Sequence, residues 1–346
     1  MKNLKKKAII LAFVLMIWAI CLAVFTPSKK PETLPEDDFI VSNEDLNFTI
    51  SDSLTKFLSK EKEEIIKAET TYKNLNTISD NGYLTPYLVL YDATNKRVLF
   101  DLNGDEVCYP ASTTKILTAC VAAQYCDEDT IFTVGDELNL VAWDSSRAYL
   151  LEGQQISFPI LLDALMLPSG NDAAYVMAAG VGRIYAGDEN LPYQEAVDIF
   201  LKLMNQTAKK IGALDSHFTC PDGYHCDDHY VTAMDMAKIA VYASEFECVR
   251  NAYSKFEEEY TLDNGDYFYW ENTNPLINPY SASYYEYATG LKTGYTDEAG
   301  CCLVATAEKD GTKLVAVALR SPSNGQRNIE LTELFERGFA LVEEYK

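Results

Sequence analysis

Positive charge is scarce in this chain of 346 residues, which has 29 lysine and arginine residues against 52 aspartate and glutamate residues. The formal net charge at pH 7 is -23. Proteins that bind nucleic acid neutralise its phosphates with a basic surface, so this balance excludes DNA and RNA as partners. It also argues against adhesion of a folded domain to anionic lipid through its surface.

Histidine is scarcer still, with three residues in the chain. His225 and His229 lie close to Cys220 and Cys226 in the sequence, and all four belong to residue types that bind metal ions. Their surroundings are rich in Gly and Asp and lack the H-E-x-x-H helix of a zinc peptidase. We therefore interpret the segment as a structural loop and predict no metal site.

The N-terminus has the pattern of a membrane anchor. Residues 8–25 form an uninterrupted apolar run behind the lysine-rich tail of residues 1–7, long enough to cross a bilayer with the lysines left in the cytoplasm. Residues 26–80 are predicted to be an acidic tether and a helical stalk, and residues 81–346 a folded domain outside the cytoplasm. A cleaved signal peptide, giving a secreted protein, is the alternative, but no clear small-x-small site follows the apolar run.

The chain contains nine cysteines, most of them in the part predicted to lie outside the cytoplasm. Disulfides can form in that environment. Cys220 and Cys226 flank a Pro-Asp-Gly turn and are the best candidate pair. Free, buried thiols are the alternative for this pair and the expectation for the other cysteines.

Hydrophobic periodicity changes along the folded part of the chain. Two strand patterns surround a turn at 93–96, and residues 113–252 have a mainly helical pattern. Strands return from about Tyr287 around a turn at 310–311, before a final helix from Asn328. Strands at both ends predict an α+β fold, in which one antiparallel sheet is flanked by helices and carries an inserted helical subdomain.

The segment YPASTTKILTA, residues 109–119, places Ser112 and Lys115 near the start of an apolar helix. Pro110 suits the first turn of a helix, and the i, i+3 spacing puts both side chains on one face. A lysine directed inward beside a hydroxyl could also be a structural pair, and an isolated S-x-x-K does not separate the two interpretations. Motifs elsewhere in the chain are needed to distinguish a catalytic pair from a structural one.

Two further motifs follow in order, Ser-Gly-Asn at 169–171 and Lys-Thr-Gly at 292–294. Each is weak evidence alone, but the three in this order are the signature of penicillin-binding proteins and class A β-lactamases. With the surrounding segments LMLPSGNDAAYVMA and GLKTGYTDEAGCCLVATAEKDG, residues 83–346 resemble the D-alanyl-D-alanine carboxypeptidases among the low-molecular-mass penicillin-binding proteins. The resemblance implies a serine β-lactamase and penicillin-binding transpeptidase-like fold.

The resemblance also implies catalysis through an acyl-enzyme. Ser112 is the expected nucleophile, and Lys115 can be its base if burial and neighbouring cations lower its pKa. Ser169 and Asn171 are expected to relay protons to the leaving amine and to hold the substrate backbone, respectively. The backbone N–H groups of Ser112 and Tyr295 would stabilise the oxyanion, where losing one donor typically costs about 3 kcal/mol.

The remaining site residues are expected to bind substrate. Gly294 would let a peptide lie close against the strand, Lys292 would bring positive charge, and Thr293 would offer a hydroxyl to the substrate's terminal carboxylate. In the family an arginine after the last strands supports that carboxylate, and Arg327 in SPSNGQRNIE is the candidate. The alternative for Arg327 is a surface residue at a helix start.

The sequence thus predicts a membrane-anchored serine D-Ala-D-Ala carboxypeptidase that removes the terminal D-alanine from peptidoglycan stem peptides, without metal or organic cofactor. β-Lactams would acylate Ser112 as substrate mimics. A β-lactamase on the same fold is one alternative, disfavoured because Glu137 and Asn139 precede the second motif instead of following it. A non-catalytic β-lactam-binding ectodomain is the other, although the tail of residues 1–7 is too short for a signalling domain.

Overall fold

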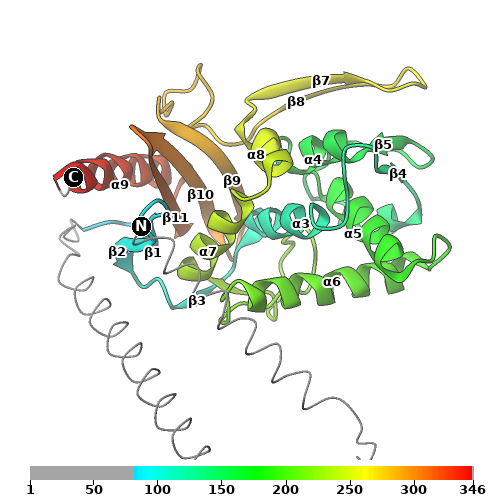
Figure 1. Ribbon diagram of the computed structural model, residues 1–346, viewed down its shortest axis with the longest axis horizontal. Coiled ribbons are helices and arrows are strands. Elements are labelled where there is room, and N and C mark those ends of the chain that lie inside the picture. The colour runs from blue at the N-terminus through cyan, green and yellow to red at the C-terminus, as the bar shows by residue number, and fades with distance from the viewer. Residues whose placement is uncertain (1–81, 345–346) are drawn as a thin grey trace, which may run out of the picture. The chain divides into compact units, whose positions relative to one another are not determined.

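A five-stranded antiparallel sheet organises the part of the chain that the computed structural model describes, residues 82–344 (Figure 1). The predicted tail, membrane anchor and tether of residues 1–80 lie outside the described residues. Within residues 82–344 no helix is long and apolar enough to cross a membrane.

The sheet joins strands from both ends of the described chain, as the sequence predicts. Its order is β2-β1-β11-β10-β9, and β1 pairs with β11 although most of the domain separates them in sequence. The turn between β10 and β11 has positive φ at both Asp310 and Gly311, as a tight hairpin turn requires. The strands are β1 (Tyr87–Asp92), β2 (Arg97–Leu102), β9 (Ala288–Thr296), β10 (Gly300–Lys309) and β11 (Thr312–Ser321).

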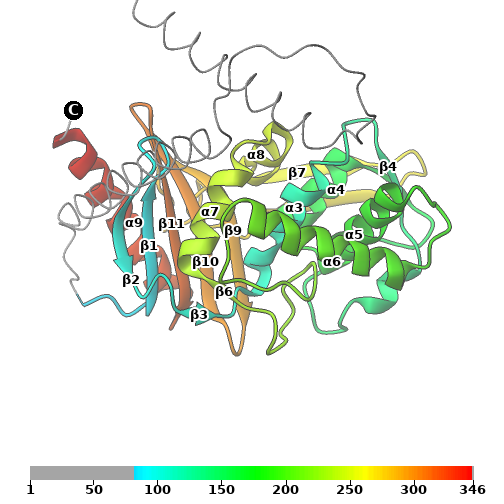
Figure 2. The same cartoon turned by 60° about the horizontal axis from the view of Figure 1, so that its bottom comes forward.

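The central strands are buried on both faces because their alternate side chains enter two different cores. Leu88 and Leu90 of β1 pack on the side of the C-terminal helix α9 (Asn324–Glu344), whereas Val89 between them joins the core on the opposite side. Figures 1 and 2 show α9 on one side of the sheet, with α7 (Ala233–Ala243) on the other. Because side chains alternate between the two faces of a strand, each central strand contributes side chains to both cores.

A helical subdomain is inserted between β3 (Val107–Cys108) and the later strands. Its centre is α3, in which every residue is buried, and α3 follows directly on the 3₁₀ turn η1 that carries Ser112. This confirms the mainly helical prediction for 113–252, although three short strands, β4, β5 and β6, lie within that range. The other elements of the insertion are η1 (Ala111–Thr114), α3 (Lys115–Ala122), β4 (Ile131–Thr133), η2 (Asp136–Leu140), β5 (Gln155–Ser157), α4 (Phe158–Met166), α5 (Asn171–Ala186), α6 (Tyr193–Lys210), β6 (Val231–Thr232) and α8 (Glu247–Ser254).

A hairpin that the sequence analysis did not predict follows α8. Strands β7 (Glu257–Thr261) and β8 (Tyr267–Glu271) pair in antiparallel register and extend away from the sheet (Figure 1). The Asn-Gly dipeptide at 264–265, with Gly265 at φ +90°, was the available signal for this turn. The Trp270 Nε1–H group donates to the carbonyl of Ala148 at 3.2 Å and so holds β8 against the helical subdomain.

No disulfide forms among the eight cysteines of residues 82–344, so the pairing considered for Cys220 and Cys226 is wrong. Cys220 instead directs its thiol at the carbonyl oxygen of Tyr224, with Sγ 3.4 Å away. Burial also raises its pKa well above the ordinary value. Cys220 is therefore an unreactive part of the loop packing in this structure.

Candidate active site

The three motifs meet at one cleft of about 910 Å³. Its walls come from the loop before α5, from β9 and from the beginning of α9. Seven of the nine predicted site residues line it, while Lys115 and Lys292 lie beneath its surface and are fully buried. The seven are Ser112, Ser169, Asn171, Thr293, Gly294, Tyr295 and Arg327.

Ser112 is positioned by two glycines that let other segments approach its backbone. A Cβ atom on Gly223 would lie 1.9 Å from the carbonyl oxygen of Ala111, and one on Gly294 would lie 2.9 Å from Ser112 N. Both glycines are therefore needed for packing against η1. For Gly294 this is a second reason beside the expected close approach of a substrate peptide, which stays a prediction.

Lys115 is held beneath Ser112 by three hydrogen bonds. Its Nζ lies 2.9 Å from Ser112 Oγ, 2.7 Å from Asn171 Oδ1 and 2.7 Å from the carbonyl oxygen of Asp222. Burial lowers the pKa of Lys115 to about 8, against the opposing effect of nearby acidic groups, chiefly Asp222. Burial is therefore the cause that lowers the pKa of Lys115. The expected contribution of neighbouring cations to this pKa stays a prediction.

The three contacts of Lys115 fit a general base in both of its protonation states. The ammonium donates three protons to three acceptors. The neutral amine has two protons, which the Asn171 and Asp222 oxygens can accept, and one lone pair left for the Ser112 hydroxyl proton. Loss of one proton therefore reverses only the bond to Ser112, which is the bond through which the nucleophile is activated.

The Ser169–Asn171 loop is held in an unfavourable conformation by residues that the sequence analysis missed. Ser169 has φ of 63°, in the left-handed region that costs energy for a residue with a side chain. The Ser146 hydroxyl donates to the Ser169 carbonyl at 2.6 Å, and Asn171 N–H donates to the Ser146 carbonyl at 2.9 Å. The buried Asp172 carboxylate accepts backbone N–H groups of the same 146–150 segment, including that of Ala148 at 2.8 Å.

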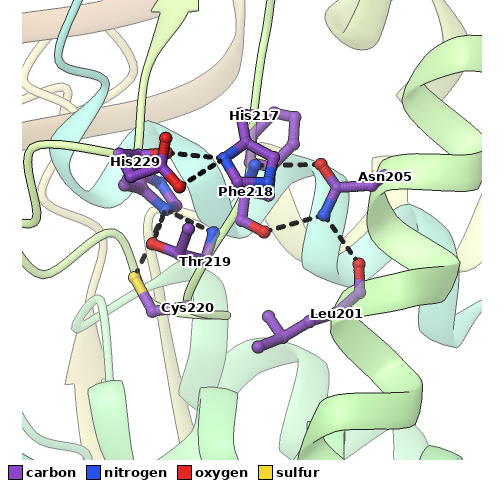
Figure 3. A network of polar contacts seen from close by, with 8 residues as sticks. Leu201, Asn205, His217, Phe218, Thr219, Cys220 and His229 are labelled. Carbon is purple, nitrogen blue, oxygen red and sulfur yellow. Dashed lines mark hydrogen bonds and ion pairs between the residues drawn. The ribbon is translucent and has the colours of Figure 1, made fainter.

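The loop that supplies the Asp222 carbonyl is fixed by His229 (Figure 3). Nδ1 of this imidazole accepts the Thr219 backbone N–H at 3.0 Å, so Nε2 carries the proton and donates to Thr114 Oγ1 at 2.8 Å. Burial lowers the pKa of His229 to about 3, which keeps the ring neutral. Among residues 82–344 no His, Cys, Asp and Glu side chains are grouped as metal ligands.

Lys292 and Thr293 share a polar partner, Thr273, that the sequence analysis also missed. The Lys292 Nζ–H group donates to Thr273 Oγ1 at 3.3 Å and to the Thr293 carbonyl at 3.1 Å. The hydroxyls of Thr273 and Thr293 lie 2.6 Å apart at the wall of the cleft. Burial, and after it the charges of Lys115 and Arg327, lower the pKa of Lys292 well below its ordinary value.

Arg327 is a buried residue at the cleft wall, which excludes its alternative as a surface residue. Nη1 donates to the Cys302 carbonyl at 3.0 Å, and Nε and Nη2 donate to Asn328 Oδ1 at 3.1 and 3.0 Å. Three of its five N–H donors are thus used within residues 82–344. The guanidinium makes no ion pair with a carboxylate of these residues, so an anion in the cleft would find it uncompensated.

Tyr295 lies next to Gly294 in the edge strand β9 and lines the cleft. Its side chain is 62% exposed, and its hydroxyl donates to Asp297 Oδ1 at 2.9 Å. The side chain is therefore largely in solvent at the cleft wall, and the assignment of the Tyr295 backbone N–H as an oxyanion donor stays a prediction.

Comparison with known proteins places this site in a family context. The sequence model of one family, described as D-alanyl-D-alanine carboxypeptidase, matches residues 73–323. D-alanyl-D-alanine carboxypeptidase DacF of Bacillus subtilis is 30% identical over 260 residues, which cover 74% of this chain and 62% of that protein. A D-alanyl-D-alanine carboxypeptidase of Streptomyces sp. strain K15 is 34% identical over 244 residues, 66% of this chain and 78% of that protein.

Solved structures agree with this fold. The crystal structure of the Streptomyces K15 DD-transpeptidase superposes with a TM-score of 0.69 and 28% identity, covering 76% of this chain and 100% of that one. The D-alanyl-D-alanine carboxypeptidase DacD from Francisella tularensis gives a TM-score of 0.62 and 26% identity, covering 74% and 70%. The chain spans less than two thirds of the length of the Bacillus subtilis relative.

The lowered pKa of Lys115 predicts how the reactivity of Ser112 depends on pH. The neutral amine is the form that accepts the hydroxyl proton, and its fraction rises as pH increases through about 8. Between pH 7 and 9 we expect the second-order rate of Ser112 labelling by a fluorescent β-lactam to rise about tenfold. A rate that is flat or falls over this range would contradict Lys115 as the base, and Ser112→Ala controls for labelling elsewhere.

Proposed function

Because this chain belongs to the D-alanyl-D-alanine carboxypeptidase family, we propose that it is a serine-type carboxypeptidase that removes the terminal D-alanine from peptidoglycan stem peptides. The observation that carries the proposal is the 2.9 Å contact between Lys115 Nζ and Ser112 Oγ at the floor of the cleft. A serine hydroxyl is nearly inert near neutral pH unless a base lies within hydrogen-bond reach. The buried amine meets that requirement.

Acylation follows from this geometry. Lys115 takes the proton of Ser112 while Oγ bonds to the carbonyl carbon of the penultimate D-alanine. The backbone N–H of Ser112 lies at a helix start, where it favours the developing oxyanion. As the C–N bond breaks, the departing D-alanine amine takes up a proton, and Ser169 is our candidate to relay that proton from the Lys115 ammonium. Water then hydrolyses the ester and regenerates Ser112.

Recognition of the substrate's free carboxylate is assigned to the cationic wall of the cleft. Arg327 retains two N–H donors without an acceptor among residues 82–344, and a guanidinium can bind a carboxylate with paired, charge-assisted hydrogen bonds. Lys292 lies behind the same wall, and a bound carboxylate would favour its charged form, which burial and the charges of Lys115 and Arg327 otherwise disfavour. A carboxypeptidase needs such a site because its substrate, unlike that of an endopeptidase, ends in a free acid.

The location of the enzyme is a further part of the proposal. We propose that residues 8–25 anchor it in the cell membrane, with the catalytic domain on the extracytoplasmic side, where peptidoglycan lies. The apolar run and the preceding lysines support this. Secretion after signal cleavage is the alternative.

Release of D-alanine tests the proposed activity. Incubation of the purified protein with a D-Ala-D-Ala peptide should release one D-alanine per peptide, and Ser112→Ala should release none. Penicillin should give a long-lived adduct at Ser112 in the intact mass, because Glu137, the carboxylate that resembles a deacylating glutamate, does not line the cleft in the part of the chain that the structure describes. Rapid penicillin turnover without an adduct would favour the β-lactamase alternative, and an adduct without D-alanine release the non-catalytic one.

Substitution of Arg327 tests carboxylate recognition. Arg327→Ala should lower kcat/KM for the D-Ala-D-Ala free acid about tenfold to a hundredfold, the effect of losing a hydrogen bond to a charged group. The C-terminal amide should be a poor substrate for the parent enzyme and little affected by the substitution. An unchanged ratio of acid to amide would exclude Arg327 as the anchor and leave Lys292 as the next candidate.

Membrane attachment is tested by fractionating cells that produce the full chain or the chain without residues 8–25. The full chain should be found with membranes at unchanged mass, and the shortened chain should not. A mature protein that has lost its N-terminus and is found in the medium would establish the secreted alternative.

A further inference from the structure

Thr273 occupies a position between the two elements that carry the site motifs. It belongs to the short Asn-Thr-Asn segment after β8, and its hydroxyl lies 2.6 Å from that of Thr293 on β9. Its backbone N–H donates to the carbonyl of Leu167 at 3.2 Å, at the end of α4 just before the Ser169 loop. Thr273 is also part of the cleft wall, so its hydroxyl is within the site and not only behind it.

The flanking asparagines fix the Thr273 backbone. Asn272 is buried, and its side-chain amide donates to the carbonyls of Tyr253 at 3.3 Å and Lys255 at 3.0 Å. Its Oδ1 accepts the Asn274 N–H at 2.9 Å, and Asn274 Oδ1 in turn accepts the Leu276 N–H at 3.1 Å. The asparagines anchor the segment and leave the threonine directed at the cleft.

A count of protons shows what this arrangement offers to a ligand. Each threonine hydroxyl carries one proton, and one of the two is shared between Thr273 and Thr293. Lys292 occupies one lone pair of Thr273 by donating to it at 3.3 Å. This favours the direction Lys292 to Thr273 to Thr293, because hydrogen bonds in a chain polarise one another. In that direction the Thr293 hydroxyl proton is the one left free.

We infer that Thr273 is a positioning residue that orients the Thr293 hydroxyl as a hydrogen-bond donor to the ligand's carboxylate. The inference rests on the proposed function for the identity of that carboxylate, a terminal D-alanine, and applies equally to the carboxylate of a β-lactam. Without Thr273 the Thr293 hydroxyl can still rotate toward a ligand, but it loses the partner that fixes its direction, and Lys292 loses an acceptor.

A positioning role and a merely structural one give different kinetics. Loss of orientation weakens recognition of the carboxylate, so the effect falls on KM and on ligands that carry the free acid. Loss of packing in the 272–274 segment would disturb Ser112 chemistry for every ligand, with or without a carboxylate. The comparison of an acid with its uncharged derivative therefore separates the two.

The test uses Thr273→Val, which keeps the branched shape and removes the hydroxyl. For the D-Ala-D-Ala free acid we expect kcat/KM to fall about threefold to tenfold, mainly through KM, as for loss of one oriented hydrogen bond. For the C-terminal amide we expect no comparable change. Acylation by penicillin should slow by a similar factor, while acylation by penicillin methyl ester should not. Thr273→Ser should restore the parent values.

Thr289→Val is the matched control. Thr289 lies on the same strand β9 and donates to Thr306 Oγ1 at 2.8 Å, so its substitution removes a comparable threonine pair outside the cleft. It should leave the ratio of acid to amide unchanged, and its thermal unfolding gives the effect of such a loss on stability alone.

Three results would overturn the inference: equal effects of Thr273→Val on acid and uncharged ligands, parent-like kinetics of Thr273→Val, or failure of Thr273→Ser to restore recognition of the acid. The penicillin pair is measured independently of peptide turnover. If the parent enzyme is acylated by penicillin but releases no D-alanine, the proposed carboxypeptidase activity fails, while the comparison of penicillin with its methyl ester still decides the role of Thr273.

Discussion

The burial of Lys115 beneath Ser112 is the constraint on which the rest of the domain depends. A lysine without contact to water is costly unless its protons find acceptors. The acceptors come from three segments, η1 with Ser112, α5 with Asn171 and the loop with Asp222. The wholly buried α3 and the glycines at 223 and 294 bring those segments within reach. The same packing that lowers the pKa of Lys115 therefore also builds the cleft.

The site gathers positive charge in a protein that is otherwise strongly acidic. Lys115, Lys292 and Arg327 are all buried, and within residues 82–344 none of them pairs with a carboxylate at ion-pair distance. Backbone carbonyls, threonine hydroxyls and asparagine amides serve as their partners instead. Since burying like charges together disfavours the charged forms, an anionic ligand that enters the cleft relieves a cost already present in the fold.

Positioning in this site is done largely by residues that do no chemistry themselves. His229 stays neutral and holds the loop that contains Asp222, while Ser146 holds the strained Ser169 carbonyl. The unpredicted β7–β8 hairpin leads into the segment with Thr273 and brings a hydroxyl to Lys292 and Thr293. The three motifs are thus held in place by neighbouring polar side chains, each of which makes defined hydrogen bonds of its own.

Features that depend on local spacing could be predicted from the sequence. The i, i+3 separation places Lys115 beside Ser112, the continuous apolar runs of β10 and β11 make a doubly buried strand pair, and the Asp-Gly dipeptide at 310–311 closes their turn. Strand patterns at both ends of the folded part were enough to predict the α+β fold, and the three motifs, with the family resemblance they carry, predicted most of the cleft residues. These inferences succeed because each rests on a backbone geometry that a few neighbouring residues define.

The distant groups that complete the site are brought together by the folding of the chain and could not be predicted from the sequence. The Asp222 carbonyl lies more than a hundred positions from Lys115, and every residue has a carbonyl, so the sequence gives no signal for this one. Thr273 and Ser146 are common residue types whose importance comes from their neighbours. The free state of Cys220 and the low pKa of Lys115 likewise follow from packing, because burial is summed over segments that meet only in the folded chain.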